Sequence, residues 1–200
     1  MYKHFFKRLF DFIGALLVLP FVLIIILILA PIIYFTDKGP IFYNAPRTGK
    51  FCRQFKMYKL RSMYVDSPDL RNADGSTFTS DEDSRVTPIG RFMRKTSLDE
   101  FPQFLNVLLG DMSFVGPRPT LGSDSLIYED LKEGNHKMRY TVKPGITGYA
   151  QAYFRNSISQ EEKFRYDAEY AKNISLWLDV KILFATAFSV IARKNINAVR

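Results

Sequence analysis

Two adjacent carboxylates, Asp99 and Glu100, are the clearest candidates for chemistry in this sequence. They lie between Thr96 and Gln103, and apolar residues at helical spacing continue to Leu108, which predicts that the pair opens a helix. The positive end of a helix keeps a nearby aspartate ionised and favours a bound cation-phosphate cluster. An ionised aspartate is a competent nucleophile toward phosphorus if the charge of the phosphates is neutralised.

The same pair also has a purely structural interpretation. Ser97 and Glu100 match the S-x-x-E capping box, in which the glutamate only satisfies a backbone N–H. Pro102 argues against it, because a helix capped at Ser97 would place a proline where its ring and missing N–H disturb the first turn. A helix start at Leu98 or Asp99 is easier, and both interpretations stay open at this point.

Groups that could neutralise a phosphate follow the carboxylate pair. Gly116-Pro117-Arg118-Pro119 holds one arginine between two prolines. A guanidinium matches phosphate oxygens in a bidentate fork, and a stiff loop lowers the ordering cost of binding. An ordinary surface turn is the alternative. The turn from Lys143 to Gly148 is similar, and Arg155 adds another phosphate candidate.

Composition limits the partners and the chemistry. A formal charge of +8 predicts attraction to nucleic acid, phosphorylated metabolites or acidic lipid headgroups. Cys52 is the single cysteine, so no internal disulfide forms, and His4 and His136 build no cluster with zinc-ligand spacing. A hard cation held by carboxylates and phosphates is compatible with the sequence.

An apolar block near the N-terminus predicts a membrane segment. From Phe12 to Phe35 about 24 residues carry no charge, enough for a helix to cross a bilayer. Both flanks are basic, so both ends prefer the cytoplasm, and a helix that enters and turns back satisfies this preference. Pro20 offers a pivot, with Pro31 as a second break, whereas an ordinary tilted crossing with a tolerated proline is the alternative.

The remaining chain predicts a mixed domain. The segment from Phe51 to Met63 alternates aromatic and basic residues and predicts a hairpin or a strand with a helix, without an RNA-binding signature. The polar stretch from Asp66 to Asp83 predicts a surface loop. Asp179 and Lys181 make it costly for the apolar tail from Ser175 to Arg193 to span a membrane, so an interfacial or core-packed helix is expected there.

Several segments together match one family pattern, in order along the chain. They are Lys7 to Asp11, Arg85 to Arg91, Thr96 to Gln103, Asn106 to Pro119 and Lys143 to Gln151. In these segments the chain resembles the bacterial sugar transferase family, the monotopic polyprenol-phosphate phosphoglycosyl transferases. The combined match around the carboxylate pair and the proline-flanked arginine is highly specific.

The resemblance implies an enzyme that uses a UDP-sugar, Mg²⁺ and polyprenyl (undecaprenyl) phosphate at the cytoplasmic face of the bacterial inner membrane. Asp99, at the position of the family nucleophile, would expel UMP and hold a covalent phosphosugar, which polyprenyl phosphate then removes. Glu100 would assist, with Mg²⁺ near Asp99. The other residues implied for substrate binding are Lys59, Arg61, Arg118, Arg155 and Asp167.

We therefore predict a mainly helical α+β fold with interfacial amphipathic helices and a small β element. Residues 1–36 are expected to form the re-entrant helix-break-helix, and residues 37–200 the cytosolic catalytic domain. The family commonly breaks this helix at a Ser-Pro pair, where this chain has Leu23-Ile24, with Pro20 about one turn earlier. A non-enzymatic adaptor that binds anionic lipid is the alternative function, and nucleic acid is not expected as a partner. Sugar, pathway and oligomeric state, a homodimer included, stay open.

Overall fold

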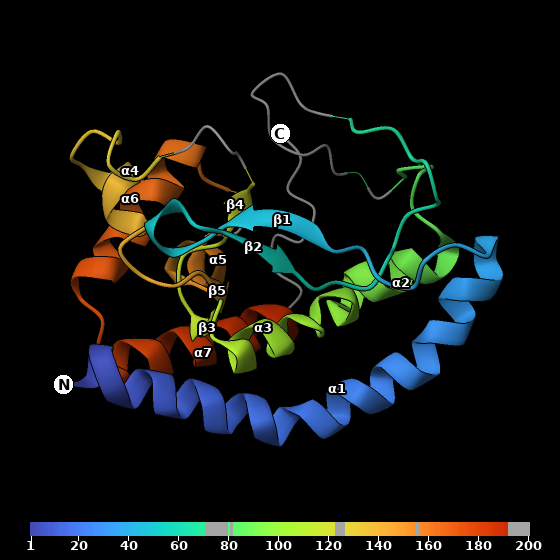
Figure 1. The fold of residues 1–200 in the computed structure, drawn as a ribbon, viewed down its shortest axis with the longest axis horizontal. Coiled ribbons are helices and arrows are strands. Elements are labelled where there is room, and N and C mark those ends of the chain that lie inside the picture. The colour runs from blue at the N-terminus through green and yellow to red at the C-terminus, as the bar shows by residue number, and fades with distance from the viewer. Residues whose placement is uncertain (71–79, 81, 123–126, 155–156, 192–200) are drawn as a thin grey trace.

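Helices dominate the fold, and one long helix runs along a whole side of it (Figure 1). The computed structural model describes residues 1–70, 80, 82–122, 127–154 and 157–191. The α-helices are α1 (Lys7–Asp37), α2 (Pro88–Thr96), α3 (Gln103–Leu109), α4 (Asn135–Arg139), α5 (Tyr149–Tyr153), α6 (Gln160–Lys172) and α7 (Leu176–Ile191). Shorter helical turns are η1 (Tyr2–Phe6), η2 (Lys50–Cys52) and η3 (Leu98–Glu100). With the two small sheets below, the predicted mainly helical α+β class is confirmed.

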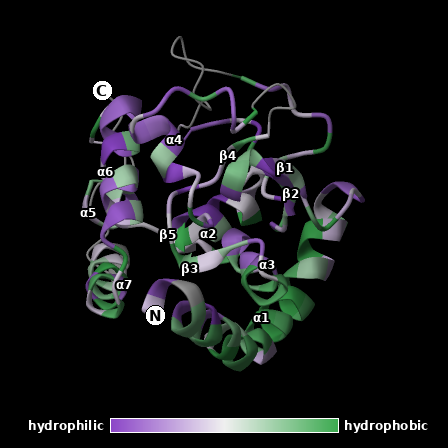
Figure 2. Ribbon diagram, turned by 60° about the vertical axis from the view of Figure 1, so that its left-hand side comes forward, coloured by the Kyte–Doolittle hydropathy of each residue, from purple (hydrophilic) through white to green (hydrophobic). Residues whose placement is uncertain are grey.

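The N-terminal helix α1 is continuous over 31 residues, although it contains Pro20 and Pro31. It bends into an arc around the domain (Figure 1), where the expected feature was a break at Pro20. A proline inside a helix removes one hydrogen bond and can bend the helix without ending it. The helix is long and apolar enough to cross a membrane, and only 17% of its most apolar stretch is buried. Figure 2 shows this apolar character along most of its length.

Polar contacts attach both ends of α1 to the rest of the domain. At the start, Lys7 Nζ lies 2.7 Å from Asp179 Oδ2 in α7, and the Arg8 guanidinium donates to the carbonyl oxygens of Val107 and Leu108 near the end of α3. At the end, Asp37 accepts two hydrogen bonds from the guanidinium of Arg61. Since one domain holds both ends, the helix cannot leave it at either end without breaking a charged contact.

Two small sheets bring distant segments together. The strands β1 (Ala45–Thr48), β2 (Gln54–Met57) and β4 (Thr120–Leu121) form an antiparallel sheet in the order β2-β1-β4. The hairpin of β1 and β2 confirms the strand expected after Phe51, although its first strand precedes that segment. The strands β3 (Ser113–Val115) and β5 (Gly145–Thr147) pair in parallel.

Close backbone packing surrounds the pairing of β3 with β5. A Cβ added at Gly145 would collide with the backbone nitrogen of Gly116, and one at Gly148 would collide with the carbonyl oxygen of Gly116. Only residues without a side chain allow this approach. These glycines therefore allow the loop that begins at Gly116 to pack directly against the backbone around Gly145.

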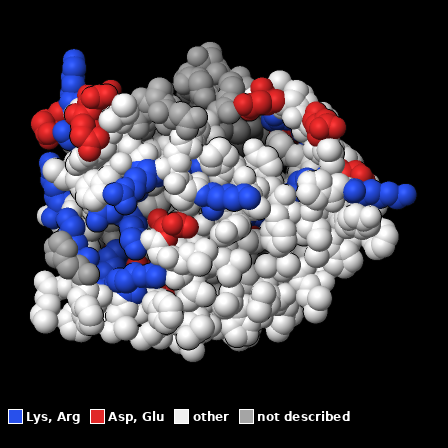
Figure 3. Space-filling view, in the orientation of Figure 1, with Lys and Arg blue, Asp and Glu red and all other residues white. Residues whose placement is uncertain are grey.

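Helix α7 (Leu176–Ile191) is core-packed on one face, which is one of the two arrangements expected for the tail. It packs on α5 and on both strands of the parallel sheet, and Ile182 is fully buried there. Its outer face exposes Trp177, Phe184 and Phe188. Figure 3 shows an uncharged surface along the side where α1 runs, with lysine and arginine side chains gathered above it. The expected loop from Asp66 to Asp83 lies mostly outside the described residues.

Candidate active site

The carboxylate pair lies in the tight turn between α2 and α3. Helix α2 ends at Thr96, and Ser97 follows it as the C-cap with a left-handed φ of 58°. Asp99 and Glu100 then lie in η3, before α3 begins at Gln103. An N-cap residue needs an extended backbone, so Ser97 cannot cap, and its side chain makes no capping hydrogen bond. The capping-box interpretation of Ser97 and Glu100 is therefore wrong. The carboxylate of Glu100 is instead available to other partners.

Lys59 joins the two carboxylates. Its Nζ lies 2.7 Å from Asp99 Oδ2 and 3.7 Å from Glu100 Oε1. The Asp99 side chain is only 2% exposed, whereas that of Lys59 is 21% exposed and covers it. The backbone fixes this arrangement, because the N–H of Leu60 donates to the carbonyl oxygen of Asp99 over 2.9 Å. The predicted nucleophile, its neighbour and the predicted Lys59 thus form one charged group.

Asn106 sets the position of the segment that carries Lys59, and the sequence analysis gave it no separate role. It is fully buried in α3, where its amide nitrogen donates to the carbonyl oxygen of Lys56 and its Oδ1 accepts from the N–H of Tyr58. One side chain thereby pairs with the backbone on alternate residues, as a neighbouring strand would. The signal available in the sequence was a single amide among the apolar residues that follow the carboxylate pair, because a polar side chain on a buried face needs a hydrogen-bond partner.

Arg118 lies in the loop between β3 and β4 and contacts Glu100 from there. Its Nη2 lies 3.4 Å from Glu100 Oε1, and its side chain is 57% exposed, so the guanidinium faces solvent beside the carboxylate. Burial raises the pKa of Glu100, but the charges of Arg118 and Lys59 outweigh it and hold that pKa at about 2. Glu100 is therefore a carboxylate over the whole neutral range. The expectation of an arginine held stiffly near the carboxylates is consistent with this geometry.

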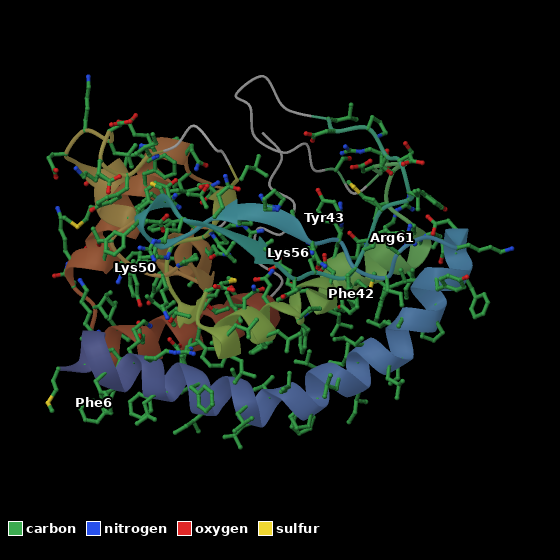
Figure 4. The ribbon with its side chains drawn as sticks, in the orientation of Figure 1. Phe6, Phe42, Tyr43, Lys50, Lys56 and Arg61 are labelled. Carbon is green, nitrogen blue, oxygen red and sulfur yellow. The ribbon has the colours of Figure 1, made fainter. Side chains whose placement is uncertain are left out.

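Three other predicted residues are not seen in this group. Arg61 pairs with Asp37, and Figure 4 places it near the end of α1. Asp167 is buried and pairs with Arg139 in α4. Burial raises the pKa of Asp167, and the charge of Arg139 opposes that shift. Arg155 lies outside the described residues.

Arg94 is a further cation near the nucleophile that the sequence analysis did not single out. Its Nε donates to Ser62 Oγ over 2.9 Å. Burial lowers the pKa of Arg94, and the negative charge of Asp99 opposes that shift, so the two side chains interact electrostatically. The signal in the sequence was the basic end of α2 directly before the carboxylate pair, where Arg94 and Lys95 occupy the last turn.

The donor set at this site suits a cation that binds mainly through its substrate. The described residues contain no group of three potential metal ligands among histidine, cysteine, aspartate and glutamate. Mg²⁺ is held in proteins by one or two carboxylates, with waters and substrate phosphates completing its shell. The adjacent Asp99 and Glu100 carboxylates fit that requirement, and the cations around them would share the charge of a diphosphate.

Comparisons with known proteins agree on one family. The family model described as bacterial sugar transferase matches residues 2–193. The chain is 41% identical over 195 residues to the UDP-glucose:undecaprenyl-phosphate glucose-1-phosphate transferase of Klebsiella pneumoniae, covering 95% of this chain and 41% of that protein. It is 40% identical over 191 residues to the uncharacterized sugar transferase EpsL of Bacillus subtilis, covering 96% of this chain and 90% of that protein.

A third relative is the undecaprenyl-phosphate galactose phosphotransferase of Salmonella typhimurium, 36% identical over 210 residues. That alignment covers 96% of this chain and 41% of the relative. The chain thus spans about two fifths of the Klebsiella and Salmonella proteins and nearly all of the Bacillus one.

Proposed function

Because the chain belongs to the bacterial sugar transferase family, we propose that it transfers a phosphosugar from a UDP-sugar to polyprenyl (undecaprenyl) phosphate and releases UMP. The observation that carries this proposal is the charged group at the α2–α3 turn. There a buried carboxylate at Asp99 is joined by Glu100, and Lys59 and Arg118 supply positive charge beside them. The name of the Klebsiella relative states UDP-glucose and undecaprenyl phosphate, and the name of the Salmonella relative states galactose and undecaprenyl phosphate.

In the first step, an oxygen of the Asp99 carboxylate attacks the sugar-bearing phosphorus. A new oxygen–phosphorus bond forms, the bond to the bridging oxygen of the diphosphate breaks, and UMP leaves with its electron pair. Lys59 covers Asp99 in the structure, so the diphosphate must draw the ammonium from the carboxylate to its own oxygens. Arg118 is exposed enough to bind the same phosphates.

In the second step, a phosphate oxygen of the lipid carrier attacks the phosphorus held by Asp99. The bond between the carboxylate and phosphorus breaks, so the carboxylate is restored and polyprenyl-diphospho-sugar is released. Glu100 assists as an ionised neighbour that stabilises the cations around the site, since its pKa lies at about 2. Asp99 and Glu100 would hold Mg²⁺, which supplies further neutralisation of phosphate charge when bound.

The lipid substrate requires a site at the membrane surface, and α1 supports a re-entrant arrangement on the cytoplasmic face. Contacts at both ends attach α1 to the same domain, which favours both ends lying on one side of the bilayer. The basic residues at both flanks prefer the cytoplasm. A polyprenyl chain cannot leave the bilayer cheaply and a nucleotide cannot enter it, so the two substrates must meet at headgroup depth.

Cysteine labelling tests this topology. One cysteine is inserted after Met1 and another replaces the exposed Lys38, each in a Cys52→Ala background. A membrane-impermeant thiol reagent should label neither site in intact cells and both in inside-out vesicles. Opposite accessibility of the two sites would show a crossing helix and overturn the re-entrant proposal.

Turnover of the purified protein tests the reaction itself. The protein in lipid nanodiscs is incubated with Mg²⁺, undecaprenyl phosphate and each member of a UDP-sugar panel, and UMP is measured. Asp99→Asn should abolish UMP release, whereas the matched change Glu161→Gln on the exposed face of α6 should not. Mass spectrometry of the enzyme mixed with Mg²⁺ and the UDP-sugar, without the lipid carrier, should find a phosphosugar on Asp99. Full activity of Asp99→Asn would reject the nucleophile, and no turnover with any sugar would favour the lipid-binding adaptor.

A further inference from the structure

The loop that presents Arg118 is held by its backbone at successive residues. The N–H of Gly116 donates to the carbonyl oxygen of Thr147 over 2.8 Å, and the N–H of Gly145 donates to that of Pro117 over 2.9 Å. The next carbonyl, that of Arg118 itself, accepts from Arg139 Nη2 over 2.8 Å. In the first two bonds the partner is the backbone of the neighbouring strand β5, whereas in the third it is a side chain.

That side chain is oriented by a buried carboxylate. Arg139 and Asp167 are 3% and 4% exposed, and Arg139 donates to Asp167 Oδ2 from Nε over 3.1 Å and from Nη2 over 2.9 Å. The guanidinium lies against the rings of Phe164 and Tyr140, at 4.5 and 5.0 Å from their centroids. The same Nη2 therefore joins the carboxylate of Asp167 to the backbone of Arg118.

We infer that Arg139 and Asp167 are positioning residues, which act on the substrate only by holding the backbone of Arg118 so that its guanidinium lies at the phosphates. This inference rests on the proposed function and gives Asp167 a role that does not require contact with the substrate. Both side chains are buried beneath the loop, and their last link ends on the residue that carries the exposed cation.

Stability alone is a weak reason for such a pair. Burying two charges costs so much hydration that well-packed apolar replacements of both are often neutral or stabilising. Removing one partner is different, because it leaves a buried charge without compensation. The pair can therefore be removed as a whole to separate its effect on the loop from its effect on folding.

The test uses the double variant Arg139→Met/Asp167→Leu in the full chain. We expect it to fold with a melting temperature close to that of the wild type, and to lose about tenfold or more in kcat/KM for the UDP-sugar, because a displaced phosphate-binding group is costly. The loss should approach that of Arg118→Ala. The same double change added to Arg118→Ala should cause almost no further loss, since it acts through Arg118 alone.

Each other outcome overturns the inference. Unchanged kcat/KM in the folded double variant would show that the loop does not need the pair. Losses that multiply in the Arg118→Ala background would show that Asp167 or Arg139 acts on the substrate directly. If the double variant does not fold, Arg139→Lys replaces it. The lysine keeps the charge pair with Asp167, but it lacks the guanidinium that joins Asp167 Oδ2 to the carbonyl oxygen of Arg118. A kcat/KM equal to that of the wild type in this variant would overturn the inference. Absence of turnover in the wild type would instead overturn the proposed function.

Discussion

Replacing Lys59 by methionine should destabilise the protein by removing the counter-charge of a buried carboxylate. Charges 2.7 Å apart attract by about 6 kcal/mol at an effective dielectric constant of ~20, before hydration is counted. Breaking one partner of a buried pair costs about 3–5 kcal/mol in practice. Since the Lys59 side chain is 21% exposed, we expect the lower end, about 3 kcal/mol.

Thermal unfolding in nanodiscs measures this loss. For a chain of 200 residues, about 3 kcal/mol corresponds to a fall in melting temperature of roughly 6–12 °C. Lys56→Met is the matched control, because Lys56 lies three residues earlier, in β2, is exposed, and has no acidic partner among the ion pairs of the described residues. Its free energy of unfolding should change by less than about 0.5 kcal/mol.

A double-mutant cycle decides whether Asp99 is the cause. If Lys59→Met destabilises by leaving the Asp99 carboxylate buried and unpaired, then Asp99→Asn should restore much of the lost stability in that background. The two changes should therefore be coupled by about 2 kcal/mol or more. Additive effects, or equal melting temperatures for Lys59→Met and Lys56→Met, would refute the reasoning.

Three further predictions follow from other parts of the fold. The pKa of Glu100 is about 2, below its ordinary value, so its ionisation stabilises the fold above about pH 4.5 and this contribution is lost as pH falls toward 2. The excess stability of the wild type over Glu100→Gln should therefore shrink between about pH 5 and pH 3 in acid unfolding, and a constant difference would contradict it. Asp179→Ala should lower stability by about 3 kcal/mol, because the buried end of Lys7 loses its counter-charge and the hydroxyl of Tyr2 loses its acceptor, and a shift in melting temperature below about 2 °C would contradict that. Gly145→Ala should destabilise by about 1–3 kcal/mol and lower UMP release, since its Cβ would meet the backbone of Gly116, and wild-type melting and activity would show that this packing is not needed.

Local patterns in the sequence predicted the elements that carry the site. The apolar block gave α1, and the spacing after Pro102 gave α3. The capping box was wrong because the residue that follows α2 adopts a left-handed conformation where the chain turns into η3, and Ser97 occupies that position. A four-residue pattern cannot reveal that the serine already ends another helix.

Long-range pairing could not be predicted in the same way. Asp167 meets Arg139 from 28 residues away, and Arg61 meets Asp37 from 24 residues away. The packing of α6 on α4 and the position of the end of α1 against the domain decide which charged residues meet. The residue types alone are compatible with many pairings. The family resemblance pointed to Asp167 and Arg61, but their partners Arg139 and Asp37 became known only from the packing.

The attachments at the two ends of α1 have a mechanical consequence. They are separated by the length of a 31-residue helix, about 46 Å if it were straight. Between them, Ala15, Leu29 and Ile33 pack into the hydrophobic core of the domain, so the two attachments and this packing together prevent the domain from rotating relative to α1. The position and orientation of the α2–α3 turn relative to α1 are thereby fixed. Only a change in the curvature of α1 would alter them.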